Sequence, residues 1–376
     1  MQGSLPDNMD IWRVKRTGGA AERITTHNSR VSHPVLLDER TLVYLANDAD
    51  GSGPWLYSID VDRRMAHRLM ASAEPYTSVS ASAAGDRLLV TATHRKRTLW
   101  RLPLGDFADE RASPTRITLA NGPAFSPRLG PDYVVYVSSV GGRESVWKLA
   151  GQSATELWSN AGAKIIGAPA ISPDGDRIAV STRIKGRSIL YVMRADGAEV
   201  RVLTDSLALH GTPAWAADGR SITSAADDRG TPQLVKVPLD GSKPTLLVQE
   251  YSTDPVWSAD GTEVVYSGPD IGTTFAVKAA TFNGSAKPFS ALTLTRGARH
   301  LAFFPGRHAL VVLRGEIQHK NLWLVDLATR QERPLTNVGA DFNVSDFDIS
   351  RDGREVVLER TEEQSNVALL DLRDHK

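Results

Sequence analysis

A short segment recurs along the chain at a fixed interval, and this repeat restricts the fold more than any other feature. Its clearest copy is ISPDGDRIAVST at 171–182. Similar segments begin at 81, 125, 215, 257 and 349, and two weaker copies cover 36–47 and 303–314. The eight copies lie about 45 residues apart, a period typical of propellers and solenoids.

The turn within each copy predicts a β-hairpin. In the copy Ser172-Pro173-Asp174-Gly175, proline presets φ for the first turn position and glycine accepts the positive φ that closes the turn. A second hairpin follows, as in RSILYVMRADGAEVRVLTD at 187–205. Helical periodicity is hard to find, so each unit is predicted to be four antiparallel strands, the blade of a β-propeller.

The two ends of the chain suggest how such a ring would close. The last unit, within 347–372, lacks a fourth strand, whereas the chain begins with an extra hairpin at 10–26. Closing the ring with these strands would leave no open sheet edge. We therefore predict an all-β fold, one eight-bladed propeller domain over 1–376, in which 10–26 completes the blade formed by 347–372. Seven blades are the alternative, if one weak copy is only a connector.

Composition excludes several classes of partner. The chain has 44 basic and 44 acidic residues and no long run of either sign, which disfavours a nucleic-acid or anionic-membrane surface. The start lacks a signal-peptide pattern and no window approaches the ~20 apolar residues of a membrane helix. We expect a monomer without membrane insertion, cytoplasmic as given, or periplasmic if cut from a longer protein. The absence of cysteine leaves the compartment open.

The repeat resembles a known family. APAISPDGDRIAV, TPAWAADG and DPVWSADGTEVVYS, followed by strands such as NLWLVDLATRQERPLT, are similar to the TolB-like propeller family, also described as WD40-like. The resemblance covers nearly the whole chain. It implies a bacterial protein-binding or sensor platform, found alone in the periplasmic Tol system or attached to kinases, transcription regulators and peptidases.

Residues that break the repeat are the candidates for function, because a fold alone does not determine one. The position before each innermost strand opens at one mouth of the central channel. In the eight predicted blades this position is occupied by His33, Ser78, Gly122, Ala168, Thr212, Asp254, His300 and Asp346. Four consecutive blades would therefore bring Asp254, His300, Asp346 and His33 to one side of the mouth.

Imidazole and carboxylate groups are ligands for divalent cations, so these four residues form a candidate metal site, with calcium as the candidate cofactor. With His33 or His300 as a catalytic base, the arrangement would resemble that of calcium-dependent lactonase propellers. The simpler interpretation is a solvent-filled funnel lined by polar groups. A wider binding face near the same mouth would include Glu74, Tyr76, Asn121, Lys164, His210 and Asn343.

Three functions follow as hypotheses. The first is a non-catalytic platform that binds a protein or peptide through one propeller face. The second is a metal-dependent esterase or lactonase at the channel mouth. The third is a propeller fragment of a larger multidomain protein.

Overall fold

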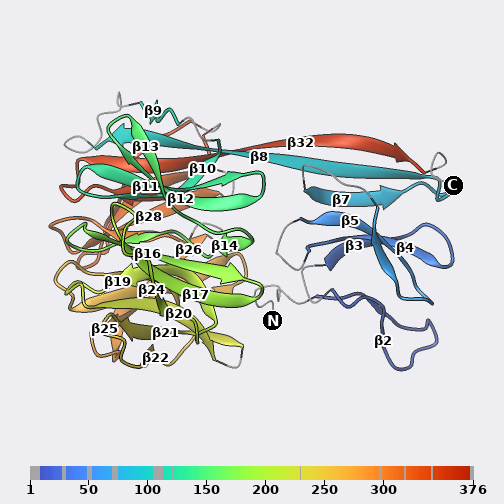
Figure 1. Cartoon of the computed structure of the whole chain (residues 1–376), viewed down its shortest axis with the longest axis horizontal. Helices are drawn as coiled ribbons and strands as arrows, with labels where there is room; N and C mark the ends of the chain where they lie inside the picture. Colours follow the sequence, from blue (N-terminus) through green and yellow to red (C-terminus); the bar gives the residue numbers. More distant parts are fainter. Residues whose placement is uncertain are drawn as a thin grey trace. The chain divides into compact units, whose positions relative to one another are not determined.

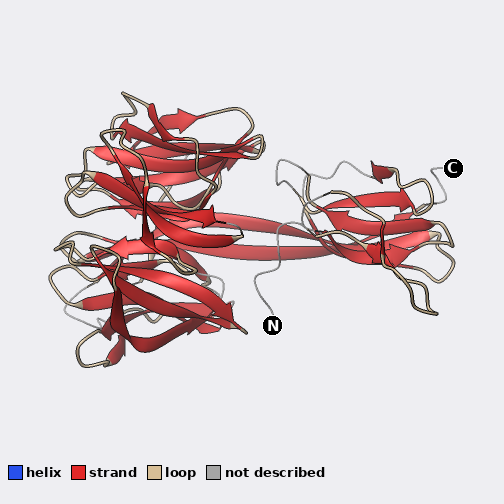
Figure 2. Cartoon of the chain, turned by 90° about the horizontal axis from the view of Figure 1, so that it is seen from below, coloured by secondary structure: helices blue, strands red, loops and turns tan. Residues whose placement is uncertain are grey.

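The computed structural model describes residues 9–27, 31–48, 53–69, 75–104, 113–119, 122–228, 230–295, 299–316, 319–339 and 342–372. Every helix or strand assigned in these residues is a β-strand, as Figure 2 shows. The all-β prediction is therefore confirmed. Within the same residues, no helix is long and apolar enough to cross a membrane.

The predicted turns form the repeated hairpins. In the clearest copy, the Gly175 N–H donates to the Ser172 carbonyl at 2.9 Å, and the Asp176 N–H donates to the Asp174 carboxylate at 3.1 Å. Gly175 has a φ of +84°, and a Cβ atom there would lie 2.6 Å from Pro131. Glycine is thus required at this turn by both backbone conformation and space.

The chain divides into two compact units (Figure 1). The ring unit comprises residues 97–362, and the terminal unit comprises 3–96 and 363–376. The division falls within two long strands, β8 (Arg87–Pro103) and β32 (Glu355–Asp371), so each strand contributes residues to both units.

The ring unit contains five sheets formed by consecutive strands and a sixth assembled from distant segments. The five sheets are β10–β13 (Ala124–Leu129, Tyr133–Val140, Arg143–Ala150, Ser153–Ser159), β14–β18 (Ala163–Ile165, Ala170–Ile171, Arg177–Ile184, Arg187–Arg194, Arg201–Thr204), β19–β22 (Leu209–Trp215, Ser221–Asp228, Thr231–Pro238, Thr245–Val248), β23–β26 (Thr253–Trp257, Glu263–Ile271, Thr274–Thr281, Ala286–Thr295) and β27–β30 (Leu301–Phe303, Ala309–Glu316, His319–Asp326, Glu332–Pro334). The sixth joins β31 (Val344–Ile349), β32, β8 and β9 (Thr115–Arg116).

An apolar core lies between each pair of neighbouring sheets, and these cores show that the ring is closed. The pairs in order round the ring are represented by Val146 and Val180, Leu190 and Trp215, Leu234 and Tyr266, Phe275 and Leu310, Leu322 and Phe347, and Val357 and Tyr136. Each of the six sheets therefore packs on two others. Burial of β-branched and aromatic side chains between sheets is the main stabilising contribution.

The terminal unit is a stack of three β elements. Its central sheet is β3–β6 (Val31–Leu36, Thr41–Ala46, Trp55–Asp60, Ala66–Arg68). One face of this sheet packs on the segment that contains β1 (Trp12–Arg13) and β2 (Glu22–Arg23), through Ile24 and Tyr44. Its other face packs on β7 (Tyr76–Ala81) and the adjoining part of β8, through Leu45 and Val90.

The structure differs from the predicted single ring of eight or seven blades. The described residues contain the eight strands predicted to be innermost, but six of them belong to the ring unit, whereas β3 and β7 belong to the terminal unit. Besides β31, the strand that pairs with β32 is β8, and within the described residues β1 and β2 pair only with each other. Residues 97–103 and 115–116, not 10–26, thus supply the outer strands of the sheet that begins with β31.

Candidate binding site in the channel of the ring unit

The innermost strands of the six sheets carry side chains at two successive channel positions. The strand registers align these positions from sheet to sheet. The first channel position holds Ser126, Ala168, Thr212, Asp254, His300 and Asp346. The second, two residues later, holds Arg128, Ala170, Ala214, Val256, Ala302 and Asp348.

A β-bulge at the start of several of these strands sets the direction of the first position. The register shifts between Phe125 and Arg128 and again between Thr253 and Val256. Within these bulges Ser126 and Asp254 have positive φ values of 53° and 50°. A bulge bends its strand and changes the direction of a side chain. The side chain at the first channel position therefore points in a different direction from those in the rest of the strand.

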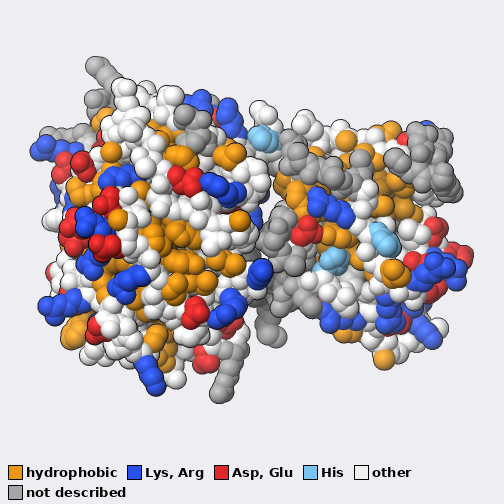
Figure 3. Space-filling view, viewed as in Figure 1, with side chains coloured by type: hydrophobic (Ala, Val, Ile, Leu, Met, Phe, Trp, Pro, Cys, Tyr) orange, Lys and Arg blue, Asp and Glu red, His pale blue; other side chains and the backbone are white. Residues whose placement is uncertain are grey.

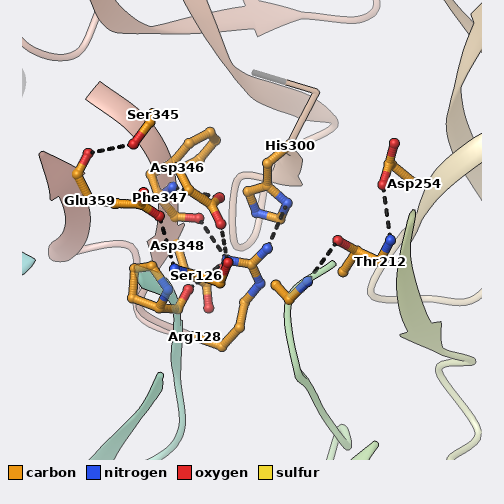
Figure 4. A network of polar contacts seen from close by, with 12 residues as sticks. Ser126, Arg128, Thr212, Asp254, His300, Ser345, Asp346, Phe347, Asp348 and Glu359 are labelled. Carbon is orange, nitrogen blue, oxygen red and sulfur yellow. Dashed lines mark hydrogen bonds and ion pairs between the residues drawn. The ribbon is translucent and has the colours of Figure 1, made fainter. Parts of the chain in front are cut away.

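A buried cluster around Arg128 links three sheets (Figure 4). The guanidinium Nη1 of Arg128 donates to Asp346 Oδ2 at 3.1 Å and to the Pro127 carbonyl at 2.6 Å. Its Nη2 lies 3.3 Å from His300 Nδ1. Since these residues belong to β10, β31 and the segment before β27, the cluster fastens the first sheet of the ring to the last two.

Burial changes the protonation of the acidic residues in this cluster. Burial raises the pKa of Asp346 to about 6, although the Arg128 cation opposes the rise. The pKa of Asp348 is also raised by burial, while Arg128 and the Leu129 N–H, 2.7 Å from Asp348 Oδ2, favour its charged form. Arg128 is therefore the shared counter-charge of both carboxylates.

His300 is held in its neutral form. Burial, and to a smaller extent the Arg128 cation, lower the pKa of its imidazole well below the ordinary value. A guanidinium can only donate, so Nδ1 accepts from Arg128 and the ring proton is placed on Nε2. Nε2 is buried and has no hydrogen-bond partner among the described residues.

Asp254 lies apart from this cluster, beside Thr212 (Figure 4). Its Oδ1 accepts a hydrogen bond from the Thr212 N–H at 3.0 Å. Gly211 makes this contact possible, because its φ is +65° and a Cβ atom there would lie 2.6 Å from Asp254 Oδ1. The backbone of one sheet therefore fixes the carboxylate of the next.

Most of these positions line a cavity of about 300 Å³ along the innermost strands. The apolar residues of its walls include Pro169, Ile171, Pro213, Trp215, Pro255 and Trp257. Its charged lining residues are Arg128, Asp254, Asp348 and Arg351. Polar and apolar atoms contribute about equally to the lining, and the volume is at the lower end of the range usual for ligand sites.

Comparison with models of known protein families also identifies the chain as a propeller. The model of the TolB β-propeller domain matches residues 90–350. The chain belongs to the TolB β-propeller family. The matched region covers most of the ring unit, and the resemblance noted from the repeat motifs is thereby confirmed.

The individual proteins that the chain resembles share only a low sequence identity with it. Tricorn protease homolog 1 of Streptomyces coelicolor is 28% identical over 255 residues, which cover 63% of this chain and 23% of the relative. The chain thus spans about a quarter of the length of that relative. TolB from Acinetobacter baumannii shares 16% identity over 90% of this chain and 79% of its own, with a TM-score of 0.48. A puromycin hydrolase shares 18% identity over 88% and 58%, with a TM-score of 0.44.

The structure brings together only part of the predicted metal site. His300, Asp346 and Asp254 lie at the first channel position of consecutive sheets, but His33 lies on β3 of the terminal unit. His33 is exposed and its Nδ1 is 3.1 Å from Ser32 Oγ. Within the described residues, no group of three His, Asp or Glu side chains is arranged to hold a metal ion.

The residues predicted for the binding face have different environments. Lys164 and His210 lie on β14 and β19 of the ring unit, where Lys164 Nζ donates to the Gly142 carbonyl at 3.2 Å. Asn343 precedes β31, and its carbonyl accepts from the Thr361 N–H at 3.0 Å. Tyr76 is instead buried in the core of the terminal unit. Glu74 and Asn121 lie outside the described residues.

Sequence reasoning missed Arg128 and misplaced one channel residue. Gly122 precedes proline as Ala168 does, and this pair imitates the start of an innermost strand. The register instead aligns Ser126 with Asp254. That correction would have placed Arg128 where the three following sheets carry Ala170, Ala214 and Val256, and a charged residue at such a small apolar position is a detectable signal.

Proposed function

We propose that the ring unit is a non-catalytic module that binds a segment of polypeptide in its channel. The observation that supports this most is the cavity along the innermost strands, lined by Pro169, Pro213 and Pro255 and by the rings of Trp215 and Trp257. The Trp215 and Trp257 N–H groups donate to the Ala170 carbonyl and to Thr223 Oγ1, each at 3.0 Å. Because these bonds fix the rings, the walls are pre-organised for apolar contact.

The polar groups of the Arg128 cluster are not placed to act as a general base. A general base needs a free acceptor within reach of the proton that it removes. His300 Nδ1 accepts from Arg128, and its Nε2 is buried. Asp346 is paired with the same Arg128. These groups therefore stabilise the ring and leave the remaining channel wall for contact with a ligand.

The charge pattern and the curated relative favour a protein ligand. Acidic and basic residues are equal in number, and on the face seen in Figure 3 their side chains are interspersed. Such a surface offers no single-sign field for nucleic acid. The curated relative is a protease homologue about four times longer than the matched region, which is in keeping with a polypeptide ligand and with a role inside a larger protein.

A library of displayed random heptapeptides tests this function. Ala170→Phe and Ala214→Phe would each fill part of the cavity, whereas Val202→Phe introduces the same side chain on the outer strand β18, where Val202 is half exposed. We expect the parent and Val202→Phe to enrich the same peptides. Both channel variants should lose at least tenfold in affinity for the enriched peptides, provided that their circular dichroism and melting curves show a folded ring.

Equal enrichment by the parent and both folded channel variants would contradict binding in the channel. The metal-dependent hydrolase hypothesis has a separate test, since it requires Asp254 and Asp346. Calcium-dependent ester or lactone hydrolysis that Asp254→Ala abolishes would support it over a non-catalytic module. Absence of hydrolysis with and without calcium, together with peptide enrichment, is the result expected here.

A further inference from the structure

We propose that the channel selects a cationic group of its peptide, an ammonium or guanidinium group, through the carboxylate of Asp254. This inference rests on the proposed function, because it names the chemistry of the ligand that the same channel takes.

Among the carboxylates that line the channel, Asp254 is the one without a cationic partner in the described part of the chain. Asp346 is paired with Arg128, and Asp348 lies in the field of the same guanidinium. Arg351 donates to the Ser172 carbonyl at 3.2 Å. Among the described residues, no Lys, Arg or His is within ion-pair distance of Asp254, and the one hydrogen bond found for its carboxylate is the Thr212 N–H on Oδ1. Since a carboxylate has about four lone-pair sites, Asp254 retains acceptor capacity for a ligand.

The position of Asp254 in the ring keeps this charge from being neutralised by Arg128. Asp254 is on β23 and Arg128 is on β10, three sheets apart in a ring of six. Figure 4 shows the Arg128 cluster and the Asp254–Thr212 pair as separate groups. The two charges therefore act on different sides of the channel.

The walls near Asp254 strengthen its attraction for a cation. Pro213, Pro255 and Trp257 line the same cavity and lower the local dielectric, which increases the energy of a charge pair relative to water. An indole face also attracts cations directly. Such a contact occurs elsewhere in the ring unit, where the guanidinium of Arg177 lies 4.9 Å from the centre of the Trp215 ring.

The carboxylate is also held in place before a ligand arrives. Gly211 lets the Thr212 N–H reach Asp254, and any side chain at Gly211 would collide with Oδ1. A pre-organised carboxylate loses little entropy on binding, so its charge contributes more of its interaction to affinity.

Four peptide amides with the common body Ala-Pro-Xaa-Pro-Ala test the inference by isothermal titration calorimetry. Three are acetylated and carry norleucine, lysine or arginine at Xaa, and the fourth has norleucine and a free amino terminus. The acetylated norleucine peptide has no cation, so it is the reference. Comparison of the other three distinguishes a side-chain cation from a terminal amine as the source of the charge.

We expect at least one cationic peptide to bind about tenfold or more tightly than the reference, as a charge-assisted hydrogen bond in a partly dry site would produce. Asp254→Asn keeps the shape of the side chain and should abolish this preference. Asp228→Asn, which removes an exposed acid at the end of β20, should leave the preference unchanged. Gly211→Ala should weaken the preference by displacing the carboxylate.

Equal affinity of the parent for all four peptides would overturn the inference while leaving the peptide-binding function intact. A preference that survives in folded Asp254→Asn would overturn it as well. If none of the four peptides binds and the heptapeptide library also shows no channel-dependent enrichment, the proposed function itself fails, and the two failures are thus distinguishable.

Discussion

Arg128 occupies a position at which the three following sheets of the ring carry alanine or valine. This departure from the repeat brings a permanent cation into the interior beside Asp346, Asp348 and His300. Only 6% of Arg128 is exposed, so its charge needs the partners that the neighbouring sheets provide. The residue therefore identifies where the ring closes, in addition to lining the channel.

Removal of the guanidinium should destabilise the ring strongly. Arg128→Met leaves the Asp346 carboxylate buried without its ion-pair partner, and breaking a buried pair costs about 3 kcal/mol or more of unfolding free energy. Arg143→Met is the matched control, because the pair of Arg143 with Glu156 is largely exposed and should contribute less than about 1 kcal/mol. Urea unfolding followed by tryptophan fluorescence measures both. Equal losses in the two variants would show that the cluster has no structural role.

The raised pKa of Asp346 predicts a pH dependence of stability with a definite sign. Between the ordinary value of 3.8 and about 6, the folded protein retains a proton on Asp346 that the unfolded chain has released. The contribution of this carboxyl to stability is thus fully present below about 4 and is lost as the pH rises through about 6. His300 acts in the opposite direction, because its lowered pKa makes stability fall as the pH drops below 6.5.

A comparison with one variant separates these two effects. The difference in unfolding free energy between the parent and Asp346→Asn should change steadily in favour of the variant from pH 4 to pH 6 and then remain constant. Urea denaturation in a series of buffers measures this difference, in which the contribution of His300 cancels to first order. A difference that is independent of pH over this range would contradict the protonation assigned to Asp346.

At the scale of strands and hairpins, most of what the sequence predicted is confirmed. Turns such as Ser172–Gly175 have local chemistry that requires a hairpin, and the eight innermost strands form where the repeats indicated. The pairing of β8 with β32 could not be predicted in the same way. Every third strand has a similar apolar pattern, so the pattern alone does not say which one lies beside β32. The cluster around Arg128 could not be predicted either. It depends on the register of β10, and Gly122-Pro123 resembles the start of an innermost strand and so indicates the wrong register.

The glycine before the first channel position offers a test of the bulge geometry. Gly211→Ala should destabilise the protein by at least about 1 kcal/mol more than Gly186→Ala. Both glycines have positive φ, but the space around Gly186 is open, whereas a Cβ atom at Gly211 meets Asp254 Oδ1 and the backbone. Thermal unfolding by calorimetry compares the two variants directly. Equal melting temperatures would mean that the β19 segment can shift to accommodate the methyl group.

At the scale of the whole chain, the six cores of the ring unit make its closure independent of residues 9–96. The sheet that begins with β31 is completed by residues 97–103 and 115–116, all of which belong to the ring unit. Each neighbouring pair of sheets shares a buried core, including the pair formed by the first and last sheets. Stability of a ring of repeated sheets arises mainly from such neighbour contacts.

A protein comprising residues 97–362 should therefore fold by itself. We expect it to be monomeric by light scattering and to unfold cooperatively, because it retains every sheet of the ring and the Arg128 cluster. A protein comprising residues 120–362 lacks the segments of β8 and β9 that cover β32, so it exposes a long sheet edge and should aggregate or melt at a lower temperature. If both proteins were monomeric with the same melting temperature, the strands supplied by 97–116 would not be needed to close the ring. The opposite result, in which only the longer protein is stable, would place the closing strands inside the ring unit and remove the need for the hairpin at 10–26.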